Sequence, residues 1–153
     1  MFVESQAMKR ILFLCTGNSC RSQMAEGWTR ALWTNTYQVY SAGTVAKGLD
    51  PRAVAVMAEA GVDLSEYRSK TLSELAGEKF DLVITVCADA DRACPIFPGG
   101  AARLHRGFDD PPRLAAAARS EEEALSHYRR VRDEIRAFAA SLPDVLAAVS
   151  SAR

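Results

Sequence analysis

The sequence predicts an α/β domain in which a parallel sheet carries helices on both of its faces. Two short and strongly apolar runs, residues 10–14 and 80–87, have the composition of strands that are buried on both sides. Segments with helical periodicity separate the candidate strands, and this alternation is typical of parallel sheets. Ligands of such sheets bind at the carboxyl ends of the strands, so the residues that follow each strand are the first candidates for a site.

The first apolar run is followed by two candidate helices and a candidate strand. Residues 23–33 place apolar side chains on one helical face. Residues 37–40 alternate between polar and apolar, and we expect this strand to end before Ser41. Pro51 suits the first turn of the next helix, and Gly61 suits the cap that closes it.

The middle of the chain contains shorter elements. Residues 69–75 are expected to form a short helix, because Thr71 and Glu74 have the spacing of a capping box. Residues 88–93 are compatible with a short helix directly after the second apolar run. Residues 103–106 are the candidate for the last strand.

The last third of the chain is expected to begin with a loop at residues 107–112. An acidic first turn and a regular apolar stripe then predict a long helix over residues 120–140. Pro143 is expected to interrupt this helix, and residues 144–151 to add a turn or two.

Length and composition limit the kinds of protein that this chain can be. The 153 residues suit one domain, over residues 9–153, after a disordered lead-in of residues 1–8. Nineteen basic residues balance nineteen acidic ones, so no nucleic acid partner is implied. No run approaches the ~20 apolar residues of a membrane span, and the N-terminus lacks the apolar core of a signal peptide. We expect a cytoplasmic monomer with no membrane partner, in which four cysteines need a catalytic, redox or metal explanation.

Residues 15–22, CTGNSCRS, join the first strand to the first helix. The first backbone N–H groups of a helix lack partners and carry the positive end of the helix dipole. Small residues let the backbone curl so that several N–H groups converge, which forms a cradle for a tetrahedral oxyanion. The residues expected to bind the oxyanion are Thr16, Gly17, Asn18, Ser19, Cys20, Arg21 and Ser22.

Cys15 lies at the base of this cradle and is the expected nucleophile, because the same dipoles stabilise a thiolate. Arg21 adds a planar cation that suits the anion, and Ser22 can donate to the thiolate. Asn18 is expected to hold left-handed backbone geometry. Cys20 is expected to pack under the cradle, or to form a Cys15–Cys20 disulfide on oxidation. A turn with a buried structural cysteine is the alternative interpretation of the whole segment.

The pattern Cys-x5-Arg-Ser between a strand and a helix resembles the low-molecular-weight tyrosine phosphatase family. The longer run CTGNSCRSQMAEG, residues 15–27, resembles the thioredoxin-coupled arsenate reductases that are built on that fold. The resemblance covers residues 9 to about 138. It implies a four-stranded parallel sheet in the order 2-1-3-4, the reduction of arsenate to arsenite, and a weak phosphatase side activity.

Cys87 and Cys94 give a second signal. Cys87 ends the second apolar run, so it is expected at the same edge of the sheet as Cys15. Their spacing alone leaves open that both are small buried residues. The resemblance implies instead that Cys15 attacks arsenic and that Cys87 then attacks Cys15, which forms a Cys15–Cys87 disulfide. Cys94 then resolves it by forming a Cys87–Cys94 disulfide, which thioredoxin reduces.

A carboxylic acid is needed to protonate the oxygen that leaves arsenic. The resemblance assigns this role to Asp110, directly before Pro111, and Asp109 is expected to orient the loop. An exposed turn is the alternative explanation of this Asp-Pro sequence. In the phosphatases a tyrosine commonly follows the Asp-Pro pair, so Pro112 and Arg113 weaken the phosphatase interpretation.

Several members of the family bind potassium beside the loop, and Asn18, Glu26 and Ser41 match the ligands that the resemblance implies. Lys70 stands where the resemblance places an aspartate, which puts the ion in doubt. The Lys70 ammonium either replaces the ion as a local positive charge or is a solvated surface group. A zinc site is disfavoured, because the cysteine spacings differ from those of the usual zinc-binding pairs.

We therefore expect an arsenate reductase that needs no organic cofactor and is regenerated by thioredoxin. Glutaredoxin with glutathione or mycothiol is the alternative reductant. Two other functions remain open: a low-molecular-weight tyrosine phosphatase, which the cradle alone would support, and a non-enzymatic redox or oxyanion sensor. His105 and His127 have no triad-like neighbours in the sequence and are expected to be non-catalytic.

Overall fold

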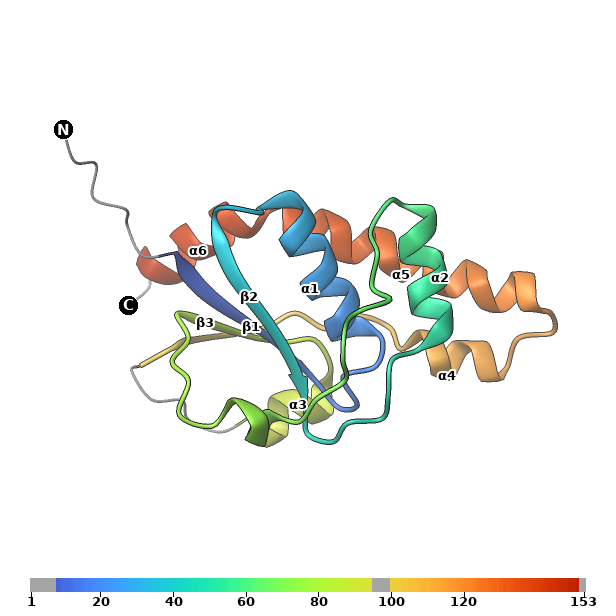
Figure 1. Cartoon of the computed structure of the whole chain (residues 1–153), viewed down its shortest axis with the longest axis horizontal. Helices are drawn as coiled ribbons and strands as arrows, with labels where there is room; N and C mark the ends of the chain where they lie inside the picture. Colours follow the sequence, from blue (N-terminus) through green and yellow to red (C-terminus); the bar gives the residue numbers. More distant parts are fainter. Residues whose placement is uncertain (1–7, 95–99, 152–153) are drawn as a thin grey trace.

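Four parallel strands form the sheet, in the order β2-β1-β3-β4 (Figure 1). The structure is a computed structural model that describes residues 8–94 and 100–151. The expected lead-in, residues 1–8, lies outside the described residues except for Met8. The predicted α/β architecture and its strand order are confirmed. The strands are β1 Lys9–Cys15, β2 Tyr37–Gly43, β3 Leu82–Thr85 and β4 Ala102–His105.

The two apolar strands β1 and β3 lie side by side in the middle of the sheet and are buried on both faces, as their composition predicts. Leu14 pairs with Thr85 across β1 and β3, and Cys15 pairs with Gly43 across β1 and β2. The carboxyl ends of these strands therefore meet at one edge. The segments that follow β1 and β3 are brought together there.

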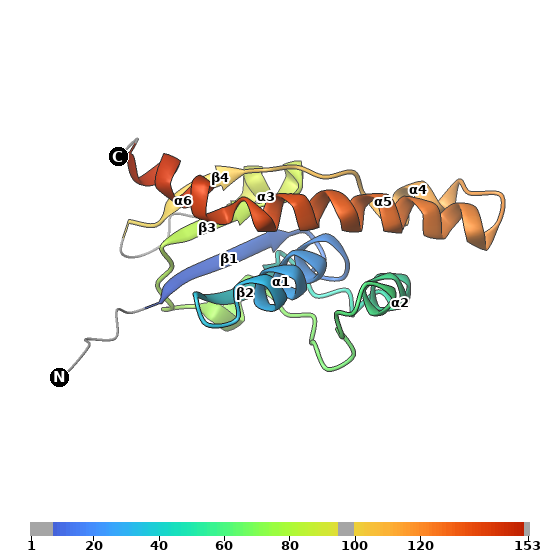
Figure 2. The ribbon, with the colours of Figure 1, turned by 90° about the horizontal axis from the view of Figure 1, so that it is seen from above.

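Helices cover both faces of the sheet (Figures 1 and 2). Their bounds are α1 Arg21–Leu32, α2 Pro51–Glu59, the 3-10 helix η1 Leu72–Leu75, α3 Ala88–Ala93, α4 Pro111–Ala116, α5 Glu121–Ala140 and α6 Leu142–Ser151. α1 and α5 pack on each other over one face, and α3 and η1 lie on the opposite face. α2 and α4 both pack against α5. Within the described ranges, no helix has the length and apolar character needed to cross a bilayer.

The helix ends follow from local sequence. Asp50 caps α2 by accepting a backbone N–H of its first turn at 2.9 Å, and Pro51 takes the first helical position. Gly61 follows this helix with a φ of +86°, in the left-handed region that favours glycine. Thr71 and Glu74 form the predicted capping box of η1.

β2 is longer than the sequence predicts. We expected the strand to end before Ser41, but it continues to Gly43 in register with the end of β1. The residues Ser41, Ala42 and Gly43 are too small to show a strong strand pattern, yet all three are buried against β1. The extension brings β2 to the same edge as Cys15.

The sequence does not predict α4, because residues 107–112 are interpreted as a loop. Asp110 is the N-terminal cap of this helix, and Pro111 lies at its first position, where its missing N–H costs nothing. Pro143 marks the expected break, since α5 ends at Ala140 and a separate helix, α6, follows it. It lies in the first turn of α6, which begins directly after the cap of α5.

Candidate active site

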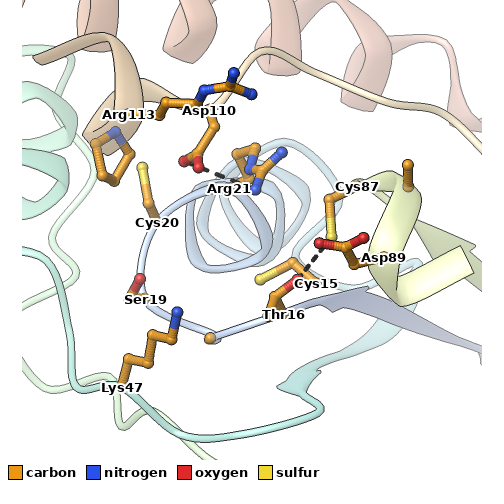
Figure 3. A pocket seen from close by; sticks show the side chains of 13 residues that line it. Cys15, Thr16, Ser19, Cys20, Arg21, Lys47, Cys87, Asp89, Asp110 and Arg113 are labelled. Atoms are coloured by element: carbon orange, nitrogen blue, oxygen red, sulfur yellow. Dashed lines mark hydrogen bonds and ion pairs between the residues drawn. The ribbon is translucent and has the colours of Figure 1, made fainter. Parts of the chain in front are cut away.

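A pocket of about 460 Å³ opens at the carboxyl ends of β1 and β3 (Figure 3). One side is formed by the oxyanion loop, which we define as residues 15–22. The loop contributes Cys15, Thr16, Gly17, Ser19, Cys20 and Arg21. The rest of the lining comes from three other segments and consists of Lys47, Cys87, Ala88, Asp89, Asp110, Pro112 and Arg113.

The thiol of Cys15 lies at the base of this loop, with only 4 % of the residue exposed. Its Sγ is 2.8 Å from the Ser22 Oγ and accepts the backbone N–H of Asn18 at 3.3 Å. Asn18 Nδ2 donates to the same Ser22 oxygen at 2.8 Å, so the Ser22 hydrogen is available to be donated to Cys15. Two hydrogen bonds therefore converge on the sulfur of Cys15 and fix its position.

Asn18 fixes the shape of the loop from below the pocket. The backbone φ of Asn18 is +47°. Among residues 8–94 and 100–151, Asn18 is the one residue other than glycine that has a positive φ. Its side chain donates to Ser22 and Ser41 and accepts from the backbone N–H of Lys70 and from Gln23 Nε2, both at 2.9 Å. These bonds hold a conformation that would otherwise be strained.

Gly43 allows the end of β2 to approach the oxyanion loop closely. A Cβ at this position would lie 2.7 Å from the Asn18 nitrogen, 2.7 Å from the Thr16 carbonyl oxygen and 2.4 Å from the Val45 carbonyl oxygen. All three are backbone atoms, which cannot swing aside as a side chain can. The glycine is required by space, since no positive φ is recorded for it.

Arg21 and Asp110 lie next to each other in the pocket (Figure 3). Arg21 donates to the Phe108 carbonyl oxygen at 3.0 Å, and its Nη2 lies 3.7 Å from Asp110 Oδ1. The Asp110 side chain is 40 % exposed and lines the pocket, so it can reach a bound ligand. Asp109 is instead held by Arg130 at 3.1 Å, and it is absent from the pocket lining. The structure thus gives the two neighbouring carboxylates different positions.

Cys87 shares the pocket with Cys15. It caps the N-terminus of α3, where its Sγ accepts the backbone N–H of Ala90 at 3.4 Å. Thr16 Oγ1 lies 3.2 Å from the same sulfur, which links the oxyanion loop to α3. This contact could not be predicted from the sequence, because it joins residues 71 apart.

Cys94 caps the other end of α3 and is not part of the pocket lining. Burial raises the pKa of its thiol, and the nearby Arg103 opposes this rise. All four cysteines are free thiols. At ~1.5 Å per helical residue, Cα atoms seven residues apart are about 10.5 Å apart, whereas a disulfide needs less than ~7 Å. Cys87 and Cys94 therefore cannot be joined while α3 is helical.

Cys20 lines the pocket but is almost wholly buried at the start of α1. Burial raises the pKa of this thiol well above its usual value, and the negative charge of Asp50 adds to the effect. A thiol in this environment stays protonated and is a poor nucleophile. Its contribution is packing at the point where the oxyanion loop joins α1.

The residues expected to bind potassium are brought together but are already paired. Ser41 donates to Glu26 Oε1 at 2.6 Å, and Asn18 turns its amide nitrogen toward Ser41. The other Glu26 oxygen accepts from Arg30 at 2.8 Å. Lys70 Nζ lies 4.0 Å from Glu26 Oε1, and burial lowers the pKa of this ammonium while Glu26 opposes that shift. With these donors in place, the site does not fit an additional cation.

Lys47 lines the pocket, although the sequence does not predict it there. Its backbone N–H donates to the Gly17 carbonyl oxygen at 2.9 Å. Its side chain lies across Gly17, where an added Cβ would be 2.8 Å from Lys47 Cδ. Figure 3 shows the ammonium end directed toward the oxyanion loop. The loop that carries Lys47 has no periodic pattern, so no signal in the sequence marks it.

The geometry can bind a tetrahedral oxyanion over a nucleophilic thiol, with a second thiol close by. Comparison with known proteins agrees with this arrangement. The sequence matches the family described as low molecular weight phosphotyrosine protein phosphatase over residues 10–150. The chain is 50 % identical over 127 residues to the arsenate reductase of Halalkalibacterium halodurans, covering 83 % of this chain and 89 % of that protein. It is 52 % identical over 127 residues to the arsenate reductase of Bacillus licheniformis, with the same coverage.

A solved structure, described as an arsenate reductase in the phosphate binding state, superimposes with a TM-score of 0.71 at 27 % identity. The match covers 93 % of this chain and 99 % of that one. Fold, oxyanion loop and sequence therefore agree, and the chain belongs to the low molecular weight phosphotyrosine protein phosphatase family.

Proposed function

We propose that this protein is an arsenate reductase that passes electrons through Cys15, Cys87 and Cys94. The main support for this proposal is that Cys87 lines the same pocket as Cys15. A phosphatase of the family needs one thiol at the base of the oxyanion loop, but here a second thiol lines the same pocket and caps a helix that ends at a third. The high identity to proteins named arsenate reductases supports the same assignment.

The first step is the formation of an adduct. Arsenate has the shape and charge of phosphate, so the backbone N–H groups of the oxyanion loop and the Arg21 guanidinium would bind it. The Cys15 thiolate attacks arsenic, and an oxygen leaves after it receives a proton from Asp110. A bond between Cys15 sulfur and arsenic(V) is the product.

The second step reduces arsenic. The Cys87 thiolate attacks the Cys15 sulfur and forms a Cys15–Cys87 disulfide, and the electron pair of the sulfur–arsenic bond remains on arsenic. Arsenic(V) thus becomes arsenic(III) and leaves as arsenite, while the two sulfurs are oxidised. The contact between Thr16 and the Cys87 sulfur supports this step, because it holds the second nucleophile beside the loop.

The third step restores Cys15. Cys94 attacks the Cys87 sulfur, the Cys15 thiolate leaves, and a Cys87–Cys94 disulfide remains. Because this disulfide cannot form across an intact helix, α3 must open first. We propose thioredoxin as the reductant of this disulfide and the cytoplasm as the location, where thiols are kept reduced.

We also propose that the enzyme works as a monomer without an organic cofactor and without potassium. The Lys70 ammonium lies where it can balance the buried Glu26 carboxylate, which is the part that a bound cation would play. A residual phosphatase activity is the second candidate function, because Cys15, Arg21 and Asp110 are arranged as phosphoester cleavage would need them.

The decisive experiment measures arsenate-dependent NADPH oxidation with thioredoxin and thioredoxin reductase. A parallel assay uses glutathione, glutaredoxin and glutathione reductase. We expect turnover in the first assay and little in the second. Hydrolysis of p-nitrophenyl phosphate without arsenate reduction would identify a phosphatase, and disulfide formation without arsenite release would identify a sensor.

A further inference from the structure

The middle of α3 is tied to the ends of β3 and β4. Thr85, the last residue of β3, is buried and donates from its hydroxyl to Asp91 Oδ1 at 3.1 Å. The same hydroxyl oxygen lies 2.8 Å from Nδ1 of His105, the last residue of β4. Thr85 and His105 are partners in the register of the two strands. Asp91 lies between the two cysteines that α3 separates.

The direction of these hydrogen bonds follows from counting hydrogens. A threonine hydroxyl carries one hydrogen, and here it is donated to the Asp91 carboxylate. The Thr85 oxygen can then only accept from His105, so Nδ1 of that imidazole carries a hydrogen. The result is a relay in which His105 donates to Thr85 and Thr85 donates to Asp91.

A second set of contacts joins Asp91 to Cys94. The backbone N–H of Cys94 donates to the Asp91 carbonyl oxygen at 3.4 Å, and Arg103 Nη2 donates to that oxygen at 3.4 Å. The Arg103 guanidinium lies 4.0 Å from the Asp91 carboxylate and also hydrogen-bonds Cys94. At the other end of the helix, the Asp91 N–H donates to the Cys87 carbonyl oxygen at 3.1 Å. Opening α3 breaks contacts at Asp91 in both directions.

We propose that Thr85 and His105 are positioning residues that hold α3 closed through Asp91 and thereby set how readily Cys94 reaches Cys87. The effect on arsenate reduction rests on the proposed function. The opening of α3 does not, because it can be followed through disulfide formation between Cys87 and Cys94 in the absence of arsenate. In the catalytic cycle, the Cys94 thiolate attacks Cys87 and Cys15 leaves as a thiolate. Each relay bond stabilises the closed helix and so slows this step.

The test measures formation of the Cys87–Cys94 disulfide in the absence of arsenate. It uses a Cys15→Ser background, so that Cys87 cannot form a disulfide with Cys15. Diamide, an azo-type thiol oxidant, accepts the two electrons and two protons that Cys87 and Cys94 lose as their sulfur–sulfur bond forms. The rate of disulfide formation is followed by mass spectrometry. Amide hydrogen exchange over residues 88–94 of the reduced protein gives an independent measure of opening.

Two substitutions of Thr85 separate the hydroxyl from the packing. Thr85→Val removes the hydroxyl and keeps the branched shape, and it should speed both disulfide formation and amide exchange about threefold to tenfold. Thr85→Ser keeps the hydroxyl and should behave as the parent protein. Thr29→Val is the matched control, because Thr29 is equally buried and its hydroxyl has no hydrogen-bond partner within the described structure.

Asp91→Ala provides a second approach if Thr85→Val does not fold, since it removes the oxygen that accepts the Thr85 hydroxyl and the Asp91 side chain is 44 % exposed. It should also accelerate both readouts. The proposal is overturned if Thr85→Val and Asp91→Ala change them no more than Thr29→Val does, or if Thr85→Ser has the effect expected of the valine. Failure of the wild-type protein to reduce arsenate would instead overturn the proposed function, because neither readout here uses arsenate.

Discussion

Thr16 Oγ1 lies 3.2 Å from the sulfur of Cys87, so the residue after the proposed nucleophile contacts the second cysteine directly. Because Cys15 and Cys87 both line one pocket, we expect them to react with little movement. Cys94 differs, because it is separated from Cys87 by the whole of α3. Electron transfer through the three cysteines should accordingly consist of one step within a fixed site and one step that requires a conformational change.

Cys15→Ser should abolish arsenate reduction and leave the fold intact. A serine hydroxyl is not ionised near neutral pH, so neither Asn18 nor Ser22 can stabilise an attacking anion there. The measurement is steady-state arsenite production with thioredoxin, with circular dichroism as the check on folding. Measurable turnover by this variant would remove Cys15 from the mechanism.

Asp110→Asn should slow adduct formation by roughly 10²–10⁴-fold, the usual contribution of a positioned general acid. Asp109→Asn is the natural comparison, because it removes the neighbouring carboxylate, which pairs with Arg130 instead of lining the pocket. Its effect should be much smaller. Rapid-quench measurement of a single turnover gives both rates, and a reversed order would show that the two aspartates are wrongly assigned.

Cys94→Ser should release about one arsenite per enzyme molecule and then stop. The Cys15–Cys87 disulfide would form as usual, but no thiol would remain to resolve it. Mass spectrometry of peptides from the stalled protein should identify that disulfide. Sustained turnover with thioredoxin would contradict the resolving role of Cys94.

Lys47→Gln should raise the KM for arsenate about tenfold and leave kcat nearly unchanged. The Lys47 side chain lies over Gly17 at the pocket, and a cation there attracts an anion before any bond is made. Lys79→Gln removes the same charge from an exposed site before β3, at the opposite end of the sheet, and serves as the control. The Lys47 effect should weaken as ionic strength rises. A change confined to the KM for thioredoxin would mean that Lys47 contacts the partner protein instead.

Lys70→Met should lower the free energy of unfolding by about 1–2 kcal/mol, because the buried Glu26 carboxylate would then have Arg30 as its one cationic partner among residues 8–94 and 100–151. Urea unfolding of the variant, with Lys79→Met as a surface control, measures the loss. Wild-type stability and activity should be the same in potassium chloride and in sodium chloride of equal concentration. A stabilisation of the wild type by potassium alone would show that an ion binds after all.

Much of this structure could be predicted because its information is local. The apolar runs of β1 and β3 need no distant partner to be recognised, and an asparagine in a tight loop is a natural candidate for left-handed geometry, which Asn18 adopts. Pro51 and Gly61 likewise mark the start and the end of α2 through their own backbone preferences.

The features that the sequence did not predict depend on long-range geometry. Thr85 and His105 become neighbours through the register of β3 and β4. Neither segment contains a local pattern that predicts this pairing. Lys47 reaches the pocket because its loop lies alongside the oxyanion loop. The start of α4 is a different case, because the local sequence Asp110-Pro111 is typical both of a turn and of the first positions of a helix.

The close approach at Gly43 has a consequence for recognising such sites in other sequences. The Cys-x5-Arg-Ser pattern defines the loop, but the loop can adopt this shape only if the end of the second strand leaves room for its backbone. In this chain, a glycine 28 positions after the nucleophile, paired with it across the sheet, is thus required by the loop although it carries no chemistry. A chain that has the cysteine and the arginine but a larger residue here would need a differently shaped loop, and its motif alone would be a poor guide to oxyanion binding.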